Sequence, residues 1–288
     1  MKTFFDVLEI APKTWHISEY RNTSMYLLAG EASALLIDTG YGVGDIWAEI
    51  RKLTSLPVAV VLTHCHPDHM GGIGHFDEIY VQARDWEAVW NTTEEQVSEL
   101  ITFFGLDTPG TFPRAFGDFG KLRPLSENDV FDLGGRTVTV YETPGHSPGS
   151  VVLLDSQTEF LFSGDICNPH LLLSVPQNMY TSLSQKTCFE SVETLRRSLE
   201  KMKTIPCKKI YNGHFDELGQ QPLYDGIIDQ QIENCRKILE DRAPILDRTE
   251  FPFVQDDCCR YAVEGRSMLV YNPKSISASF MIEDMQKL

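Results

Sequence analysis

The feature that most constrains this chain is the string His-x-His-x-Asp-His, which is formed by His64, His66, Asp68 and His69. It follows an apolar run at residues 58–62 that predicts a buried β-strand. Three imidazoles and a carboxylate therefore crowd into the turn after a strand, which packing alone rarely requires. Imidazole and carboxylate are ligands that zinc prefers, and three or four of them fix one ion while leaving a position for water.

The spacing of this string divides its ligands into two sets. His64 and His66 alternate along an extended segment and point to one side, whereas Asp68 and His69 lie beyond the bend. One ion can take the first set and a second ion the other. The string therefore predicts a site that activates water with metal ions. Cys65 alternates with the two histidines, so we expect its thiol to point into the core.

Four further segments complete a pattern that resembles the signature of the metallo-β-lactamase superfamily. Each segment carries one aspartate or histidine in the family's order: Asp38 in residues 36–40, His146 in residues 143–149, Asp165 in residues 162–165 and His214 in residues 212–214. The resemblance covers roughly residues 14–216. It implies an α+β fold, an αββα sandwich in which two mixed β-sheets are flanked by helices.

The resemblance also implies where two ions would be bound. His64, His66 and His146 would hold the first ion, Asp68, His69 and His214 the second, and Asp165 would bridge both. We expect two divalent ions, with zinc first and iron or manganese as alternatives, because availability in the cell often decides the metal. Some β-lactamases carry cysteine at the bridging position. Aspartate there favours two ions and argues against that antibiotic-hydrolysing subgroup.

Three residues have expected roles beside the ions. Asp38 is expected to accept the second N–H of a ligating imidazole, although a cap for the turn before Gly40 explains this aspartate nearly as well. Asp68 is expected to orient or deprotonate the attacking water besides binding metal. Tyr180, by a loose similarity to the lactonases, is expected to stabilise the oxyanion. The other histidines, His16, His75 and His170, are expected to be structural, with a place in the pocket lining as the alternative for His170, which follows Asp165 closely.

The expected activity is that of a metal-dependent hydrolase acting on an ester, thioester, lactone or similar bond of a small molecule. The layout is most similar to glyoxalase II-like thioesterases and to acyl-homoserine lactonases, which share all seven ligand positions. One alternative is an iron-dependent oxidoreductase of the persulfide dioxygenase type, which retains the string at residues 64–69. Another is a non-catalytic binding protein on the same scaffold, which the complete ligand set disfavours.

Composition restricts the partners and the compartment. The 288 residues carry 25 basic and 41 acidic side chains, and the resulting net charge of −16 repels phosphate backbones and disfavours nucleic-acid partners. No stretch of about 18 apolar residues predicts a membrane span, and the first residues do not resemble a signal peptide. The seven cysteines are odd in number and scattered, as is typical of reduced thiols. We therefore expect a cytoplasmic enzyme with a small-molecule substrate.

The chain is expected to divide into a metallo-β-lactamase-like domain at residues 1–245 and a C-terminal β extension at residues 246–288 packed on the same domain. Residues 91–124 are expected to be an insertion that covers the metal site as a lid, or else an ordinary surface connection. Gly134-Gly135 between two strand patterns predicts a tight hairpin. The extension could lengthen a sheet, support a homodimer or cover a sheet edge.

Overall fold

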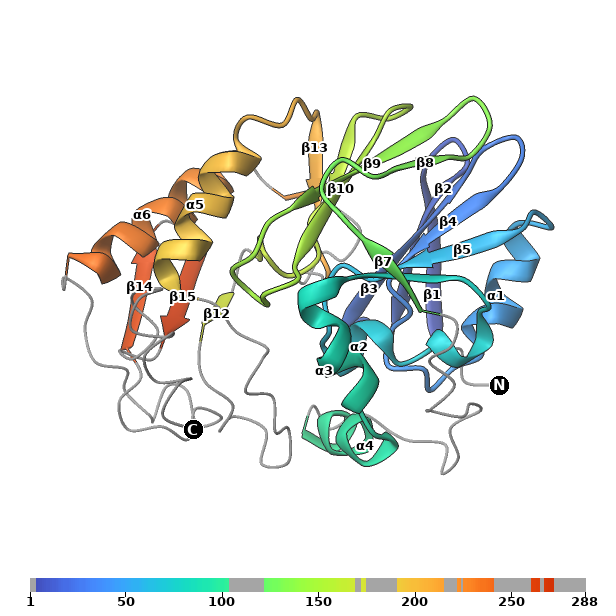
Figure 1. Ribbon diagram of the computed structural model, residues 1–288, viewed down its shortest axis with the longest axis horizontal. Coiled ribbons are helices and arrows are strands. Elements are labelled where there is room, and N and C mark those ends of the chain that lie inside the picture. Colours follow the sequence, from blue (N-terminus) through green and yellow to red (C-terminus); the bar gives the residue numbers. More distant parts are fainter. Residues whose placement is uncertain are drawn as a thin grey trace.

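Two β-sheets pack face to face in this protein, with helices on both outer sides, as the computed structural model shows (Figure 1). The structure describes residues 4–103, 122–168, 172–174, 191–214, 222–223, 225–240, 260–264 and 267–271. The predicted αββα sandwich is confirmed.

The first sheet has seven strands that lie in chain order. They are β1 Phe5–Ala11, β2 Thr14–Glu19, β3 Thr23–Ala29, β4 Ala34–Ile37, β5 Val58–Val61, β6 Ile79–Gln82 and β7 Leu122–Leu125. Strands β1 to β4 pair antiparallel, whereas β4 to β7 pair parallel. Because β4, β5 and β6 run in one direction, the loops that follow them leave from the same edge of the sheet. The sequence patterns did not indicate β1 or β7.

The second sheet has five strands in the order β13-β11-β10-β9-β8. They are β8 Val130–Asp132, β9 Thr137–Glu142, β10 Val151–Asp155, β11 Phe160–Phe162 and β13 Lys209–Tyr211. Strand β13 pairs parallel with β11 and the other neighbours pair antiparallel. The predicted hairpin joins β8 to β9, and its two glycines have φ values of 83° and 71°. Side chains with a Cβ rarely adopt such values, which explains Gly134-Gly135.

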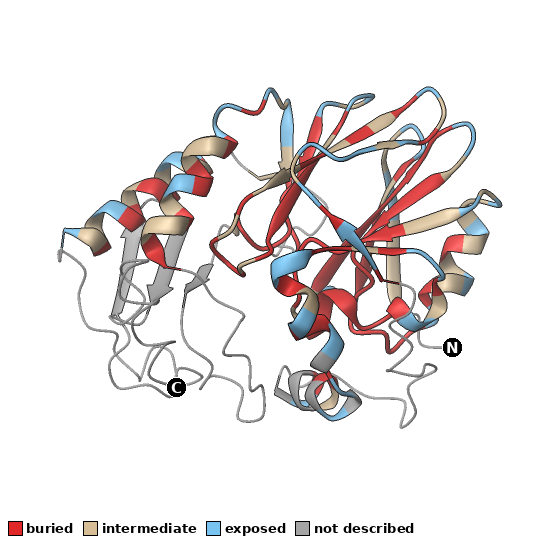
Figure 2. Cartoon of the chain, viewed as in Figure 1, coloured by how far each residue is buried: buried red, intermediate tan, exposed pale blue. Residues whose placement is uncertain are grey.

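Alternating side chains on the strands divide the core into layers. Between the sheets, Leu28 and Leu35 of the first sheet belong to the same buried cluster as Val140 and Leu153 of the second. Residues with the opposite parity, such as Leu27, face the helices outside. Figure 2 shows the facing strands as mostly buried. This double-sided burial explains why several strands read as continuous apolar runs rather than as strict alternation.

Helices cover both outer faces. They are α1 Ile46–Leu53, α2 Pro67–Met70, α3 Trp86–Asn91 and α4 Glu94–Phe103, with the short 3₁₀ turns η1 Ile73–His75 and η2 Ala83–Asp85, and then α5 Val192–Met202 and α6 Ile227–Leu239. Helices α1 and α3 pack on the first sheet, and α5 and α6 pack on the second. Within the described residues, none of these helices has the length and apolar character needed to cross a membrane.

Local sequence explains where α5 begins and which face it buries. The hydroxyl of Ser191 accepts the backbone N–H of Thr194 at 3.1 Å, an N-cap bond that satisfies a donor of the first turn. Val192, Leu195 and Leu199 then recur at helical spacing, and all three are buried against the second sheet.

A third, three-stranded sheet joins a mid-chain segment to the C-terminal region. It has the order β12-β15-β14, with β12 Leu172–Ser174, β14 Arg260–Glu264 and β15 Ser267–Tyr271. The hairpin expected near residues 260–271 is present, and it packs on α6 (Figure 1). The division into domains at residue 245 stays a prediction, as does the lid at residues 91–124, of which 104–121 lie outside the described residues.

Candidate metal centre

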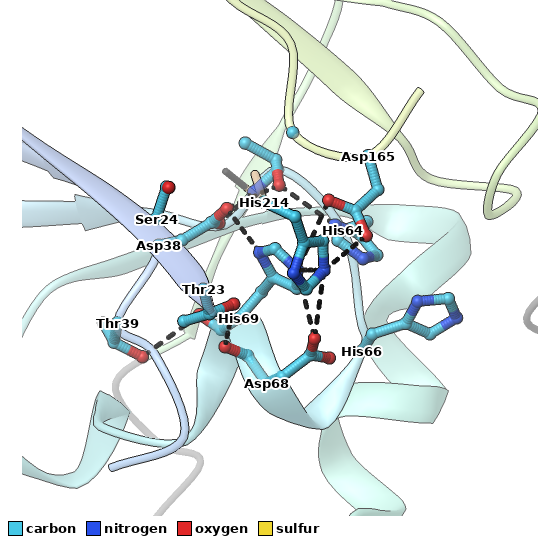
Figure 3. Close-up of polar contacts among 12 residues, drawn as sticks. Thr23, Ser24, Asp38, Thr39, His64, His66, Asp68, His69, Asp165 and His214 are labelled. Carbon is cyan, nitrogen blue, oxygen red and sulfur yellow. Dashed lines mark hydrogen bonds and ion pairs between the residues drawn. The ribbon is translucent and has the colours of Figure 1, made fainter. Parts of the chain in front are cut away.

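The predicted ligands come from loops at one end of the sandwich, where the two sheets meet. Asp38 follows β4, and the string that begins at His64 follows β5. From the second sheet, His146 lies between β9 and β10, Asp165 follows β11 and His214 follows β13. The sheets are joined at this end, because the backbone N–H of Ser24 in β3 donates to the carbonyl of Gly213 at 2.7 Å. Figure 3 shows the side chains of Asp68, His69, Asp165 and His214 pointing toward one another.

Three imidazoles form one cluster, here called the first trio: His64, His66 and His146. One ligand atom from each lies within 4.8 Å of the others. Nε2 of His146 is 2.8 Å from Nδ1 of His66. Burial, assisted by neighbouring imidazoles, holds the pKa of His64 well below its usual value and lowers the pKa of His66 to about 3. Burial also lowers the pKa of His146, so each imidazole of the trio favours its neutral form, which has one nitrogen lone pair.

A hydrogen-bond chain selects the tautomer of His64. The Thr63 hydroxyl donates to Oδ2 of Asp38 at 2.7 Å, because an ionised carboxylate can only accept. The same hydroxyl lies 3.0 Å from Nδ1 of His64 and must therefore accept from it. This leaves a lone pair on Nε2 of His64, which is buried and has no hydrogen-bond partner among the described residues. An orphaned lone pair of this kind is what a metal ligand requires.

Asp68, His69 and His214 form a second trio, also with ligand atoms within 4.8 Å of one another. Nδ1 of His69 donates to Asp38 Oδ2 at 3.0 Å, and Nδ1 of His214 donates to the Asn22 carbonyl at 2.9 Å. Each ring therefore carries its lone pair on Nε2 when neutral, and these two Nε2 atoms are only 3.3 Å apart. Two lone pairs that face each other at this distance need a proton or a metal ion between them.

Charge in the second trio leads to the same conclusion. Burial lowers the pKa of His214, but the carboxylates of Asp165 and Asp68 outweigh burial and raise it to about 10. Burial also opposes ionisation of Asp68, yet His69 and His214 lower its pKa to about 2. Buried carboxylates beside these imidazoles thus create a strong demand for positive charge, which a divalent ion satisfies.

Asp165 lies between the two trios. Its Oδ1 is 3.5 Å from Nε2 of His69, and its Oδ2 is 3.6 Å from Nε2 of His146 and 3.0 Å from Nε2 of His214. Oδ1 is buried and lacks a hydrogen bond from any described residue. A Cβ on Gly213 would lie 2.3 Å from this oxygen. Glycine before His214 therefore makes room for the carboxylate.

All seven predicted ligands converge in this way, and Asp38 contacts one of them. Two other predicted residues, Tyr180 and His170, lie outside the described residues, so the oxyanion role of Tyr180 stays a prediction. His16 belongs to neither trio, since it is buried in β2 and bonds to Ser24 Oγ at 2.8 Å. Cys65 is buried in the core, as expected.

Sequence reasoning missed the buried carboxylate of Glu19, at the end of β2. It accepts four consecutive backbone N–H groups, those of residues 41–44, at 2.6 to 3.2 Å. The loop of residues 41–44 packs on the C-terminal end of helix α2, which carries Asp68 and His69. A Cβ on Gly42 would lie 2.1 Å from the carbonyl oxygen of Gly71, the residue that caps this helix. A signal existed in Gly40, Gly42 and Gly44, whose spacing allows a chain to wrap closely around an anion.

Comparison with known proteins agrees with this fold. A family model described as the metallo-beta-lactamase superfamily matches residues 19–214, and the chain belongs to this superfamily. Its relatives include the acyl-coenzyme A thioesterase MBLAC2 of Gallus gallus, which is 30% identical over 222 residues, or 70% of this chain and 75% of the relative. The atrochrysone carboxyl ACP thioesterase dmxR1 of Cryptosporiopsis sp. (strain 8999) is 25% identical over 248 residues, or 82% of this chain and 64% of the relative.

Among solved structures, a metallo-beta-lactamase family protein from Thermus thermophilus has a TM-score of 0.56 at 18% sequence identity. The match covers 92% of this chain and 100% of that protein. At this identity the likeness shows the fold alone. The predicted family and fold are confirmed, and the names of the relatives agree with the predicted enzyme of the hydrolase class.

Proposed function

We propose that this chain is a hydrolase of acyl thioesters with a dinuclear metal site formed by the two trios and Asp165. The observation that carries this proposal is the position of Asp165, whose Oδ2 lies 3.0 Å from Nε2 of His214 in the second trio and 3.6 Å from Nε2 of His146 in the first. A carboxylate placed in this way suits a bridge between two ions. The thioesterase relatives in two substrate classes, coenzyme A and carrier-protein thioesters, support the choice of bond.

The donor set fits divalent zinc. Imidazole nitrogen and carboxylate oxygen suit this borderline ion, and both trios offer them in buried positions. His64, His66 and His146 would hold one ion, Asp68, His69 and His214 the other, and Asp165 would contact both. When bound, such ions supply hydroxide near neutral pH and polarise the scissile carbonyl. Iron and manganese remain the alternatives that metal analysis decides.

The residues of the chain supply orientation and proton handling. The pKa of Asp68 is held to about 2, so this carboxylate is a weak base and is better suited to orienting the attacking water than to storing its proton. The Asp38 carboxylate and the Asn22 carbonyl fix the rings of the second trio by accepting their Nδ1–H groups. The hydroxyl of Tyr180 is the proposed hydrogen-bond donor to the oxyanion.

The acidities at the site favour a thioester over an ordinary ester. Asp68 and Asp165 both have lowered pKa values and are ionised at neutral pH, so neither can protonate a leaving group. A thiol has a pKa of about 8.5, and the thiolate leaves without assistance. An alkoxide is about as basic as hydroxide, whose conjugate acid has a pKa near 15.7, so its departure would depend on a bound cation, whereas the departure of a thiolate would not.

The test begins with protein purified without added metal and analysed for its elements. The metal-loaded enzyme is then assayed on a panel of acyl-coenzyme A thioesters, the matched oxyesters, lactones, phosphodiesters and persulfides. We expect two zinc-like ions per chain and preference for a thioester over the oxyester of the same acyl group. One iron per chain with persulfide oxidation would favour the oxidoreductase. Two ions together with hydrolysis of lactones alone would make lactones the substrate class in place of thioesters. A chain without metal would favour a binding protein.

The proposal places the enzyme in the cytoplasm with a small-molecule substrate and no nucleic-acid partner. A homodimer through the C-terminal extension stays open. Sedimentation of the purified chain would test it, since a dimer doubles the mass at micromolar concentration and a monomer does not.

A further inference from the structure

Asp85 is a buried carboxylate with no role in the mechanism proposed above. It ends the 3₁₀ turn η2, which leaves β6 at the same edge of the sheet as the ligand loop after β5. Its side chain is completely buried. A charged group is rarely placed in such a position unless polar partners compensate for the loss of water.

The partners of Asp85 lie on the two loops that carry the first trio. Its Oδ2 accepts the hydroxyl of Ser147 at 2.6 Å, and its Oδ1 accepts the backbone N–H of Gly149 at 2.7 Å. Both donors belong to the loop of His146. The backbone N–H and the thiol of Cys65 also donate to this carboxylate, and Cys65 lies between His64 and His66. One carboxylate therefore ties a loop of the first sheet to a loop of the second.

The packing around Asp85 leaves little freedom. A Cβ on Gly149 would lie 2.5 Å from Cγ of Asp85, so glycine is needed for the backbone to come this close. The hydroxyl of Ser150 also bonds to the Ser147 hydroxyl and backbone N–H, each at 2.9 Å. The loop of His146 is thus closed around the carboxylate by side-chain and backbone bonds.

The second trio has different supports. Its rings are oriented by the Asp38 carboxylate and the Asn22 carbonyl, and the backbone of His69 bonds to Thr39. None of these bonds involves Asp85. A change at Asp85 should therefore disturb one trio more than the other.

We propose that Asp85 is a positioning residue that sets the spacing of the first trio, and that it governs the affinity of that trio for its ion. The proposal rests on the metal site of the proposed function. Asp85 belongs to neither trio, and it acts through the backbone of residues 64–66 and 146–149. Outer partners of metal ligands typically change metal affinity by about 10- to 100-fold.

The test uses full-length, metal-free protein titrated with Co²⁺, whose visible absorption reports each site as it fills. Asp85→Asn replaces one acceptor oxygen by an NH2 group, which donates and cannot accept, so the bonds from Ser147 to Oδ2 and from Gly149 to Oδ1 cannot both be kept. We expect the dissociation constant of the first trio to rise by about tenfold or more, while the second changes less than about twofold. His66→Ala, which lacks the first trio, identifies which transition belongs to which site.

Two further variants separate positioning from general destabilisation. Ser147→Ala removes only the bond to Oδ2 and should raise the same constant by a smaller factor, which keeps the test valid if Asp85→Asn does not fold. Asp155→Asn removes another fully buried carboxylate, outside both trios, and should leave the ratio of the two constants unchanged. An unchanged ratio in both Asp85→Asn and Ser147→Ala, or an equal weakening of both sites, would overturn the proposal.

These outcomes can be told apart from failure of the proposed function. Two ions with a selective effect of Asp85→Asn, but no thioester cleavage, would support the positioning role and reject the proposed substrate. Thioester cleavage with an unchanged ratio would reject the positioning role alone. A wild-type chain that takes up no Co²⁺ would reject both.

Discussion

The guanidinium of Arg136 forms a two-pronged ion pair with the carboxylate of Asp155, in which Nε is 2.7 Å from Oδ1 and Nη2 is 2.9 Å from Oδ2. Neither side chain is exposed. The remaining donors of Arg136 bond to the carbonyls of Lys13 and Ala29 and to the hydroxyl of Thr14, at 2.8 to 3.2 Å. This one side chain therefore links the edge of the second sheet to strands β2 and β3 of the first.

Replacement of this arginine should destabilise the whole fold. In Arg136→Met the carboxylate of Asp155 stays buried without its partner, and we expect the free energy of unfolding to fall by about 3–5 kcal/mol. Urea denaturation at pH 7 measures the loss. Arg197→Met removes an exposed arginine that pairs with Glu193 one helical turn away, and it should change stability by less than about 0.5 kcal/mol. Similar losses in the two variants would contradict the linking role of Arg136.

Glu19→Gln should loosen the loop of residues 41–44. The amide of glutamine presents its own N–H groups to two of the four backbone donors that now bond to the Glu19 carboxylate. The unmet donors should cost about 2–3 kcal/mol of stability, and hydrogen exchange at these four amides should accelerate. Glu9→Gln is the control, because Glu9 accepts one exposed N–H from the described part of the chain, that of Lys13. Unchanged exchange in Glu19→Gln would refute the prediction.

His16 should make the protein less stable in mild acid. Burial lowers its pKa from 6.5 to about 4, although Asp6 opposes the shift. The unfolded chain binds a proton below pH 6.5 that the folded chain accepts only near pH 4, so unfolding takes up a proton between these values. Stability from neutral His16 is therefore complete above pH 6.5 and declines by up to about 3 kcal/mol as the pH falls to 4.

The measurement for His16 is the free energy of unfolding against pH in wild type and in His16→Gln. Between pH 6.5 and 4, the free energy of unfolding of the variant should fall less steeply than that of wild type, by a slope that corresponds to about one proton taken up on unfolding. Above pH 7 the two curves should run parallel. If the two slopes agree in acid, His16 is already protonated in the folded protein.

His66→Ala should empty the first trio. Two imidazoles rarely hold an ion that three hold well, so we expect one ion per chain in place of two. Activity should fall by more than the roughly 100-fold that loss of an outer partner costs. His75→Ala, at a histidine outside both trios, is the control for metal content. A His66→Ala protein with full metal content and full activity would remove the first trio as a metal site.

The sequence alone determined the family, the αββα sandwich and the candidate ligands. The reason is that each ligand stands in a short local string, such as the one from His64 to His69, and each string follows a strand with its own apolar pattern. Gly134-Gly135 likewise carried enough local information to fix a hairpin, because few residues accept a positive φ.

Only the tertiary structure decided which atoms hold the site in place. Asp85 meets Ser147 across 62 positions of chain, and His214 meets the Asn22 carbonyl across 192. The pairing of β12 with β15 also joins distant segments, because Leu172 lies opposite Leu269. Such contacts form because folding brings strand ends from two sheets to one place, and no local pattern of residues records which donor then faces which acceptor.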